Sequence, residues 1–391
     1  MTKKHLLKES FIATIIIVLS TYIISFIPWS NEYGKALHQG FADFDIYDLY
    51  YSGKSGFNTQ RDSNIVLVQL GNNRLEIAEQ LQLINKHSPK VIGIDAFFER
   101  NTDSDIVFKN ITDNIPNLVF INRYTESGIV PNVFNNTEDR CGFGNFLGTE
   151  YSVIRTFVPA LKIHNVNYDA FASCITHIAD SSKYQTLKER NNNVELINFK
   201  GNIESYTNLS AEELIEYEQS NQLQSILNNK IVLLGFFTKE TDLPVLSDIH
   251  YTPLNDEVAG KSYPDMYGVV IHANIISMIL SCNYATLASK AISYLYAFII
   301  TFFFYYYIMT RYKRKAHPSH TIFLIVQIFG ILLVLYFFLK LYDWFLYKVS
   351  LEPIMISMVL SLEFFGLYEK LAIWLNKKFK YKTVFKNKHT L

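Results

Sequence analysis

Three ionisable side chains, Asp95, Asp248 and His272, have the types and surroundings of a small-molecule site. Asp95 follows the apolar run 91–94, which predicts a buried strand. Its carboxylate would then stand at the carboxyl end of a strand, the edge at which open α/β sheets bind ligands. If the segments of Asp248 and His272 pack there, a carboxylate–imidazole cluster could bind a ligand, a metal ion or a proton. The alternative is that these groups cap turns and helix ends, with His272 hydrogen-bonded in the core.

Arg155 completes the candidate ligand-binding residues, because it lies among apolar residues that predict a strand. The alternative is a structural ion pair with a buried acid. The preceding glycine-rich stretch 142–148 has GxGxxxG spacing but lacks the strand–turn–helix context of a dinucleotide loop. We therefore interpret that stretch as a turn.

Gln327 and Glu363 are polar residues inside long apolar runs. A carboxylate deep in a bilayer is costly, so Glu363 should be paired, protonated or turned to a polar groove. Gln327 could reach a similar depth and donate a hydrogen bond. Both are candidates for intramembrane coupling or partner docking. The alternative is that the span is shifted outward and Glu363 lies near the inner headgroups.

The three cysteines, Cys141, Cys174 and Cys282, form no CxxC pair, so we predict no zinc site and expect no metal. Cys141 and Cys174 could form a disulfide if their domain is exported, and the alternative is three buried, inert thiols. The sequence contains no GxSxG, HExxH or Walker motif. We therefore expect neither enzymatic activity nor a cofactor.

Four apolar runs, 11–29, 289–310, 320–341 and 353–375, are long enough to cross a bilayer. Lysines and arginines cluster before the first run, between the second and third, and after the fourth. Short loops rich in these residues stay in the cytoplasm, so both termini are expected inside. The predicted domains are a cytoplasmic N-terminus (1–10), a transmembrane anchor (11–29), an extracytoplasmic domain (30–288), a three-helix transmembrane region (289–375) and a cytoplasmic tail (376–391).

The extracytoplasmic domain alternates between strand and helix patterns. The strongest predicted strands are 65–70, 91–94, 118–121 and 231–234, with further extended segments at 153–158 and 194–199, and the predicted helices are 74–86, 103–113, 167–180 and 267–281. Such alternation predicts an α/β domain with a mostly parallel sheet. The last helix ends a few residues before the second span, so its movement could be delivered into the bilayer.

Composition places one limit on the partners. The 36 basic residues balance the 36 acidic ones, which gives no reason to expect a nucleic-acid partner. Hydrophobic residues make up 49% of the chain, as expected for apolar blocks around a polar domain. The lipid bilayer is therefore the first expected partner.

Two stretches have the most specific patterns, Asp248 with YTP at 251–253, and GVVIHAN at 268–274. Further patterned stretches lie at 45–50, 89–99, 142–145 with 153–155, and 230–235. Together they resemble the type-2 CHASE domain, an extracytoplasmic sensor of bacterial receptors that follows one span and precedes three. The resemblance implies a sensor in the bacterial inner membrane. The chain departs from the family's acidic residues at 71–74 and 148–152, which puts a shared ligand in doubt.

Family members often continue into a kinase or cyclase domain, whereas only residues 376–391 follow the last predicted span here. We therefore expect a signal-transduction protein that binds a signal or partner outside and couples to a separate output protein in the membrane or cytoplasm. It could also form a homo-oligomer. The alternative is a structural or assembly subunit of a cell-envelope complex.

Overall fold

The computed structural model describes residues 3–24, 45–52, 61–99, 105–134, 140–147, 153–238, 248–255, 263–314 and 319–385. The chain divides into two compact units. We call Gln39–Ala285 the sheet unit, and Met1–His38 together with Thr286–Leu391 the helical unit.

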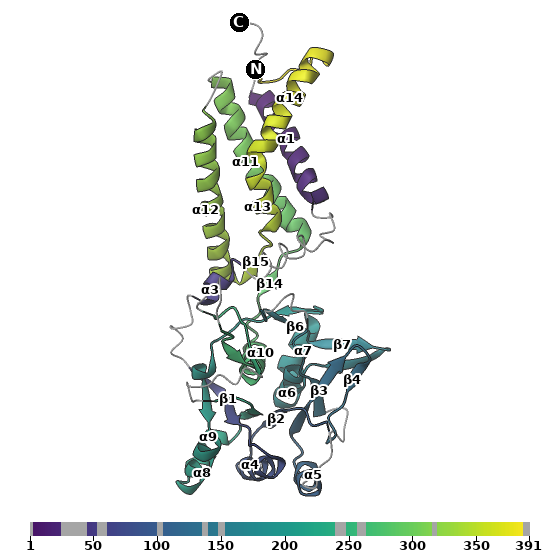
Figure 1. The fold of residues 1–391 in the computed structure, drawn as a ribbon, viewed down its shortest axis with the longest axis vertical. Helices are drawn as coiled ribbons and strands as arrows, with labels where there is room; N and C mark the ends of the chain where they lie inside the picture. Colours follow the sequence, from purple (N-terminus) through teal and green to yellow (C-terminus); the bar gives the residue numbers. More distant parts are fainter. Residues whose placement is uncertain are drawn as a thin grey trace. The chain divides into compact units, whose positions relative to one another are not determined.

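Among the described residues, a seven-stranded sheet runs through the sheet unit in the order β10–β1–β11–β2–β3–β4, with β5 also paired to β3 (Figure 1). Its strands are β1 (Asp62–Gln69), β2 (Val91–Asp95), β3 (Leu118–Thr125), β4 (Gly128–Val130), β5 (Cys141–Phe143), β10 (Tyr206–Leu209) and β11 (Ile231–Gly235). The hairpin of β3 and β4 is antiparallel, and the other described pairings within this sheet are parallel. The predicted α/β domain with a mostly parallel sheet is confirmed.

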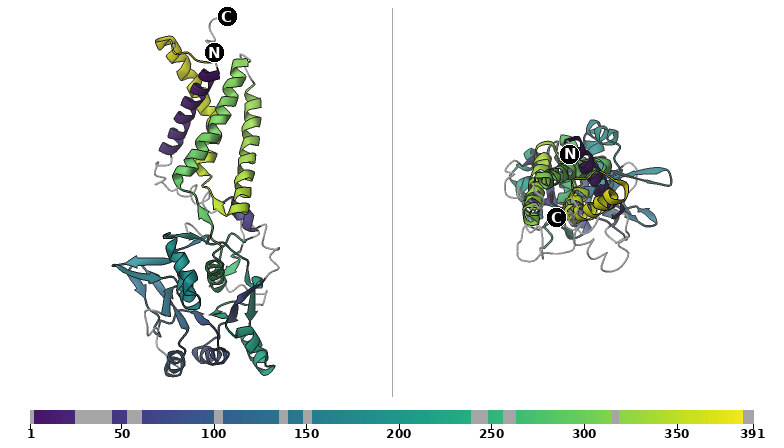
Figure 2. Two further views of the ribbon diagram at one scale, coloured as in Figure 1. Left: turned by 180° about the vertical axis from the view of Figure 1, so that it is seen from behind. Right: turned by 90° about the horizontal axis from the view of Figure 1, so that it is seen from above.

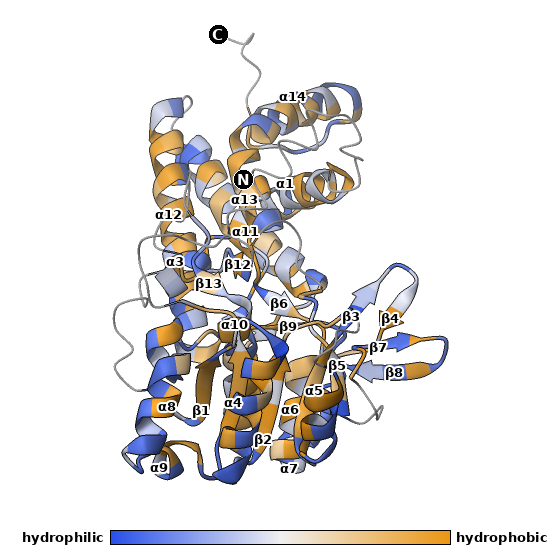
Figure 3. Ribbon diagram, turned by 60° about the horizontal axis from the view of Figure 1, so that its bottom comes forward, coloured by the Kyte–Doolittle hydropathy of each residue, from blue (hydrophilic) through white to orange (hydrophobic). Residues whose placement is uncertain are grey.

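Helices cover both faces of this sheet. On one face, α4 (Arg74–Lys86), α5 (Asp105–Asp113), α8 (Ala211–Gln219) and α9 (Leu223–Leu227) share an apolar core with the strands. On the other face lie α6 (Phe171–Ala179), α7 (Ser181–Glu189) and α10 (Gly268–Ser281). Because β11 is covered on both sides, all five of its residues are buried, which explains its unbroken apolar sequence. Figure 3 shows the same hydrophobic character on β1 and β2.

Shorter elements complete the sheet unit. They are α3 (Asp48–Ser52), β6 (Thr156–Phe157), β7 (Ala160–Ile163), β8 (Val166–Asp169), β9 (Glu195–Leu196), η2 (Ile203–Ser205), β12 (Ile249–His250) and β13 (Met266–Tyr267). The helix predicted from residue 167 is wrong at its start, since β7 and β8 form a hairpin there. His164 and Asn165 turn that hairpin with φ of 47° and 66°, the geometry of a tight two-residue turn.

The helical unit contains α1 (Lys3–Ile24), α11 (Lys290–Arg314), α12 (His320–Phe345), α13 (Glu352–Val359) and α14 (Ser361–Phe379), with the short strands β14 (Thr286–Leu287) and β15 (Tyr347–Lys348). Within the described part of the chain, α1, α11 and α12 are the helices long and apolar enough to cross a membrane. α1 packs against α11, and α13 packs against both (Figure 2). The contact face of α1 carries small residues, which let membrane helices approach closely.

The last predicted span, 353–375, is interrupted. The chain forms α13 and α14 in place of one continuous helix, and Leu360 lies between them. The predicted four uninterrupted spans therefore become three long apolar helices and one broken helix pair. A break of this kind leaves backbone carbonyls that need other donors inside a bilayer.

Candidate functional site

A cavity of about 470 Å³ lies at the edge of the sheet where β2, β3 and β5 reach their carboxyl ends. Its ionisable lining residues are Asp95, Arg123, Asp248, His250 and His272. Its aromatic and aliphatic lining includes Phe97, Phe146, Leu147, Ile121 and Ile154. The volume is typical of small-molecule sites. The structure thus brings together three side chains singled out in the sequence, Asp95, Asp248 and His272.

Asp95 is the last residue of β2, where it pairs in register with Gly235 of β11. One carboxyl oxygen, Oδ1, lies 3.9 Å from His272 Nε2. The other, Oδ2, is buried and has no hydrogen-bond partner among the described residues. Burial, and secondarily the negative charge of Asp248, raise the pKa of Asp95 to about 8. Asp95 is therefore a largely protonated, neutral acid at pH 7.

His272 projects from α10, and its side chain is only 5% exposed. The ring of Phe146 lies 4.7 Å from the imidazole ring, and the ring of Phe171 lies 5.1 Å away. Burial, and secondarily the charge of His250, lower the pKa of His272 to about 3. Its Nδ1 is buried without a hydrogen-bond partner in the part of the chain that the structure describes. Asp95 and His272 are therefore two neutral, incompletely bonded groups facing one cavity.

Asp248 and His250 enter the cavity from the segment of β12. His250 Nε2 lies 3.4 Å from Asp248 Oδ1. Gly268, the first residue of α10, allows Asp248 to approach the helix closely, since a Cβ atom there would lie 3.1 Å from Asp248 Oδ1. His250 was not singled out in the sequence, although its position two residues after Asp248 would put both side chains on one side of an extended segment.

The turn after β5 forms another wall. Asn145 fixes this turn to β3, because its Oδ1 accepts from Tyr124 N–H at 2.6 Å and its Nδ2 donates to Tyr124 C=O at 3.2 Å. Gly144 lies so close to β3 that an added Cβ would be 1.8 Å from Ile121 Cδ1. The glycine-rich stretch thus has a positional role, since it lets Phe146 reach His272.

Two further charged residues, Arg123 at the rim of the cavity and Arg155 outside it, form ion pairs with acidic side chains. Arg123 at the rim pairs with Glu99, and its guanidinium lies 4.3 Å from the centre of the Phe97 ring. Arg155, the fourth predicted ligand-binding residue, does not line the cavity. Its Nε and Nη2 donate to both carboxylate oxygens of Asp48, at 2.9 and 2.6 Å. This placement corresponds to the structural alternative considered for Arg155.

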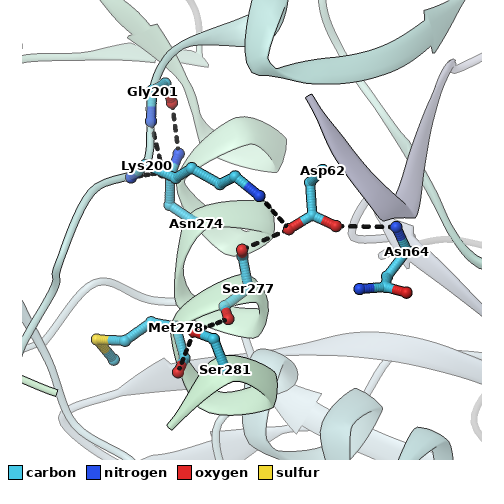
Figure 4. Close-up of polar contacts among 8 residues, drawn as sticks. All are labelled: Asp62, Asn64, Lys200, Gly201, Asn274, Ser277, Met278 and Ser281. Carbon is cyan, nitrogen blue, oxygen red and sulfur yellow. Dashed lines mark hydrogen bonds and ion pairs between the residues drawn. The ribbon is translucent and has the colours of Figure 1, made fainter. Parts of the chain in front are cut away.

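A second polar cluster holds α10 on the sheet unit (Figure 4). Ser277 Oγ on α10 donates to Asp62 at 2.6 Å, and Lys200 Nζ lies 3.0 Å from the same oxygen. Burial by itself would raise the pKa of Asp62, but hydrogen bonds from Ser277 and the Asn64 N–H, together with Lys200, hold it below its usual range. Asn274 bonds both N–H and C=O of Gly201. The hydrogen bonds of Ser277 and Asn274 thus link α10 to Asp62 and to Gly201.

In the helical unit, the amide of Gln327 donates to the carbonyls of Met358 and Val359, at 2.6 and 3.0 Å. These carbonyls lie at the break between α13 and α14. Gln327 therefore adds a donor at the interruption, where Met358 C=O also accepts from Ser361 Oγ at 2.6 Å. The candidate partner Glu363 is exposed in the first turn of α14.

The cysteines are present as thiols, so no disulfide joins Cys141 to Cys174 in this structure. Cys174 is buried in α6, and Cys141 and Cys282 are half-buried. The described residues contain no group of three or more His, Cys, Asp or Glu side chains that could hold a metal ion.

Comparison with known families gives one match, and it covers most of the chain. The profile of the CHASE2 domain matches residues 21–308. The chain belongs to the CHASE2 domain family. CHASE2 domains are extracytoplasmic sensor domains, and the resemblance found in the sequence is confirmed. No curated protein and no solved structure matches the chain.

The family places the cavity in a sensor domain. In this CHASE2 domain, Asp248, Gly268 and His272, all within the two most specific sequence patterns, line one cavity with Asp95.

Proposed function

We propose that this CHASE2 protein is a receptor of the bacterial inner membrane that binds a signal in the Asp95–His272 cavity and passes the change to a separate output protein. The observation that carries the proposal is that one helix, α10, both lines the cavity and ends a few residues before the membrane helix α11 begins. α10 presents Gly268 and His272 to the cavity, and it ends at Ser281. Only residues 282–289 separate it along the chain from Lys290, where α11 begins.

The packing of α10 supports this role. Residues 268–279 of α10 are all buried. Ser277 and Asn274 join it to Asp62 and Gly201 by hydrogen bonds. A signal that binds two positions of α10 with different affinity would shift their populations.

In the proposed topology, the sheet unit is extracytoplasmic and both termini are cytoplasmic. Three long apolar helices and the pair α13–α14 support four crossings. The basic last turn of α11, with Arg311, Lys313 and Arg314, supports a cytoplasmic end for that helix. In this proposal the chain has no enzymatic activity of its own, and the output comes from a protein partner.

Sidedness can be tested with single cysteines in a chain freed of Cys141, Cys174 and Cys282. Glu189→Cys lies at the exposed end of α7, and Lys377→Cys lies in the last turn of α14. On intact spheroplasts, a membrane-impermeant maleimide should label the first variant and leave the second unlabelled until the membrane is permeabilised. The reversed pattern would place the sheet unit in the cytoplasm and overturn the proposal.

Partner coupling can be tested by chemical crosslinking in intact membranes followed by mass spectrometry. The full chain and an Asp248→Asn variant would be compared, because this substitution removes a carboxyl group from the cavity and lies within the sheet unit. We expect crosslinks from the helical unit to a dedicated partner, and we expect their yields to change in the variant. A stoichiometric envelope partner whose crosslinks are identical in both chains would instead identify an assembly subunit.

A further inference from the structure

One of the two acidic side chains of the cavity lacks a close basic partner among the described residues, because His250 Nε2 lies 3.4 Å from Asp248 Oδ1, whereas the nearest such nitrogen to Asp95 is His272 Nε2 at 3.9 Å. Asp95 and Asp248 face the cavity from β2 and from the segment of β12. Among the described lining residues, Arg123 is the one with a permanent positive charge, and it is already paired with Glu99. The imidazole of His272 is too deeply buried to carry a proton at neutral pH. A ligand that brings its own positive charge would therefore supply the partner that Asp95 lacks when its carboxyl group ionises.

The cavity also contains polar atoms whose hydrogen bonds are incomplete. Asp95 Oδ2 and His272 Nδ1 are buried atoms without hydrogen-bond partners among the described residues. A buried polar atom that lacks a partner costs free energy, and a ligand with N–H donors would supply a partner for the carboxyl oxygen of Asp95. An ammonium group offers three donors and a compact charge.

The rest of the lining favours an organic ligand over an inorganic cation. Ile121, Leu147, Ile154 and Phe146 offer apolar surface for a hydrocarbon body. His272 Nε2 and Asp95 Oδ1 are 3.9 Å apart, and the described residues hold no group of three metal-ligating side chains. The cavity of about 470 Å³ is also much larger than a bare ion requires.

We propose that the signal recognised by the cavity is a small organic amine, bound as an ammonium between Asp95 and Asp248 with its hydrocarbon part against Phe146 and Leu147. The inference rests on the proposed receptor function and gives it a ligand class. On binding, the carboxyl group of Asp95 gives its proton to solvent and becomes the carboxylate partner of the ammonium.

Proton release makes the affinity depend on pH. The charged or titratable groups that face Asp95 are Arg123 from β3, Asp248 and His250 from the segment of β12, and His272 from α10. Below the pKa of Asp95, which is about 8, each amine must displace one proton. Amine affinity should therefore fall about tenfold per pH unit from pH 8 to pH 6.

The test uses the full chain in lipid nanodiscs, with Cys141→Ser and Cys282→Ser. Cys174 is 4% exposed, so the rate of its modification by a maleimide reports the opening of the sheet unit. The probes are two matched sets: butylammonium, butan-1-ol and butyrate, and phenylethylammonium, 2-phenylethanol and phenylacetate. At ten times its dissociation constant, a bound amine should slow modification about tenfold.

Calorimetry in two buffers of different ionisation enthalpy then counts protons. We expect release of about one proton per bound amine at pH 7, and none for Asp95→Asn, whereas the surface control Glu189→Gln should behave like the parent chain. Equal protection by the alcohols or carboxylates, no protection by either amine, or binding without proton release would overturn the proposal. Absence of amine binding would leave the partner crosslinks unaffected, and absence of a partner would leave amine binding unaffected, so failures of the two proposals can be distinguished.

Discussion

The protonation states of Asp95 and His272 lead to a prediction about the stability of the sheet unit. Asp95 has its pKa raised from 3.8 to about 8, so the folded state holds a proton that the unfolded state loses. Its contribution to stability is complete below pH 3.8 and is lost as the pH rises to 8. His272 has its pKa lowered from 6.5 to about 3. Its contribution is complete above pH 6.5 and is lost as the pH falls to 3.

Each pKa unit corresponds to about 1.4 kcal/mol, so each group alone changes the free energy of unfolding by about 5 kcal/mol over its full range. Between about pH 4 and 6.5 the two slopes have opposite signs and cancel. Above pH 6.5, Asp95 is the one of these two groups that still titrates. It should lower the free energy of unfolding by about 2 kcal/mol up to pH 8. The summed contribution of these two groups should therefore show a plateau in mildly acid solution and a decline above neutrality. Asp265, whose pKa burial raises to about 6, should add a decline of its own between about pH 4 and 6 to the stability of the parent chain.

Substitution separates the two groups. Asp95→Asn copies the protonated acid, so the variant should equal the parent below pH 4 and exceed it by about 4 kcal/mol at pH 7. His272→Gln removes the compensating slope, so this variant should lose stability steadily from pH 4 to 8. The assay is maleimide modification of Cys174 in full-length chains in nanodiscs, with each rate divided by the rate in denaturant at the same pH.

The control is Glu189→Gln, an exposed acid on α7, whose stability profile should match that of the parent. A stability difference between Asp95→Asn and the parent that stays constant from pH 5 to pH 8 would refute the reasoning. It would mean that Asp95 is already ionised and paired in the folded protein.

Three other substitutions test individual contacts. Gln327→Leu should destabilise the helical unit by about 1–3 kcal/mol, because Met358 C=O and Val359 C=O both lose the Gln327 amide and only Met358 C=O keeps a hydrogen bond from Ser361 Oγ. Detergent titration followed by tryptophan fluorescence measures this, and the exposed control Ile325→Val should have no effect. Gly235→Ala puts a Cβ 2.5 Å from Val269 Cβ. It should lower the protection of Cys174 against maleimide by about 1–3 kcal/mol. Unchanged protection would show that α10 can shift away from β11. Ser277→Ala removes a hydrogen bond to Asp62 and should cost about 1 kcal/mol at neutral pH. That deficit should shrink below pH 4, where Asp62 is protonated in the unfolded state; a deficit independent of pH would contradict the role assigned to the Asp62 carboxylate.

Local patterns predicted the elements that carry the cavity. The helix predicted at 74–86 is α4, where Asn73 caps the first turn, and the apolar run 231–234 is the central strand β11. The helix predicted from 267 is α10, which begins one residue later. These signals depend on residues within one or two turns of each other, so they survive without knowledge of the fold.

Two elements of the sheet unit, α8 and β10, were not predicted from the sequence. Ser210 and Glu213 form a capping box at the start of α8, which was not predicted. The edge strand β10 was also missed, because it is four residues long and its two middle residues are only half-buried. Short edge strands lack the continuous apolar run that marks a central strand.

The family, the parallel α/β unit, the long apolar helices and the candidate residues Asp95, Asp248 and His272 could all be predicted from local patterns. Which of these residues come into contact depends on the fold. Arg155 pairs with Asp48, which is 107 residues away in the sequence. Gln327 donates to carbonyls at a helix break that no local pattern predicted. The protonation states of Asp95 and His272 likewise come from burial and from neighbours distant in the chain. Desolvation and long-range pairing depend on how segments pack in space, and spacing along the sequence does not encode them.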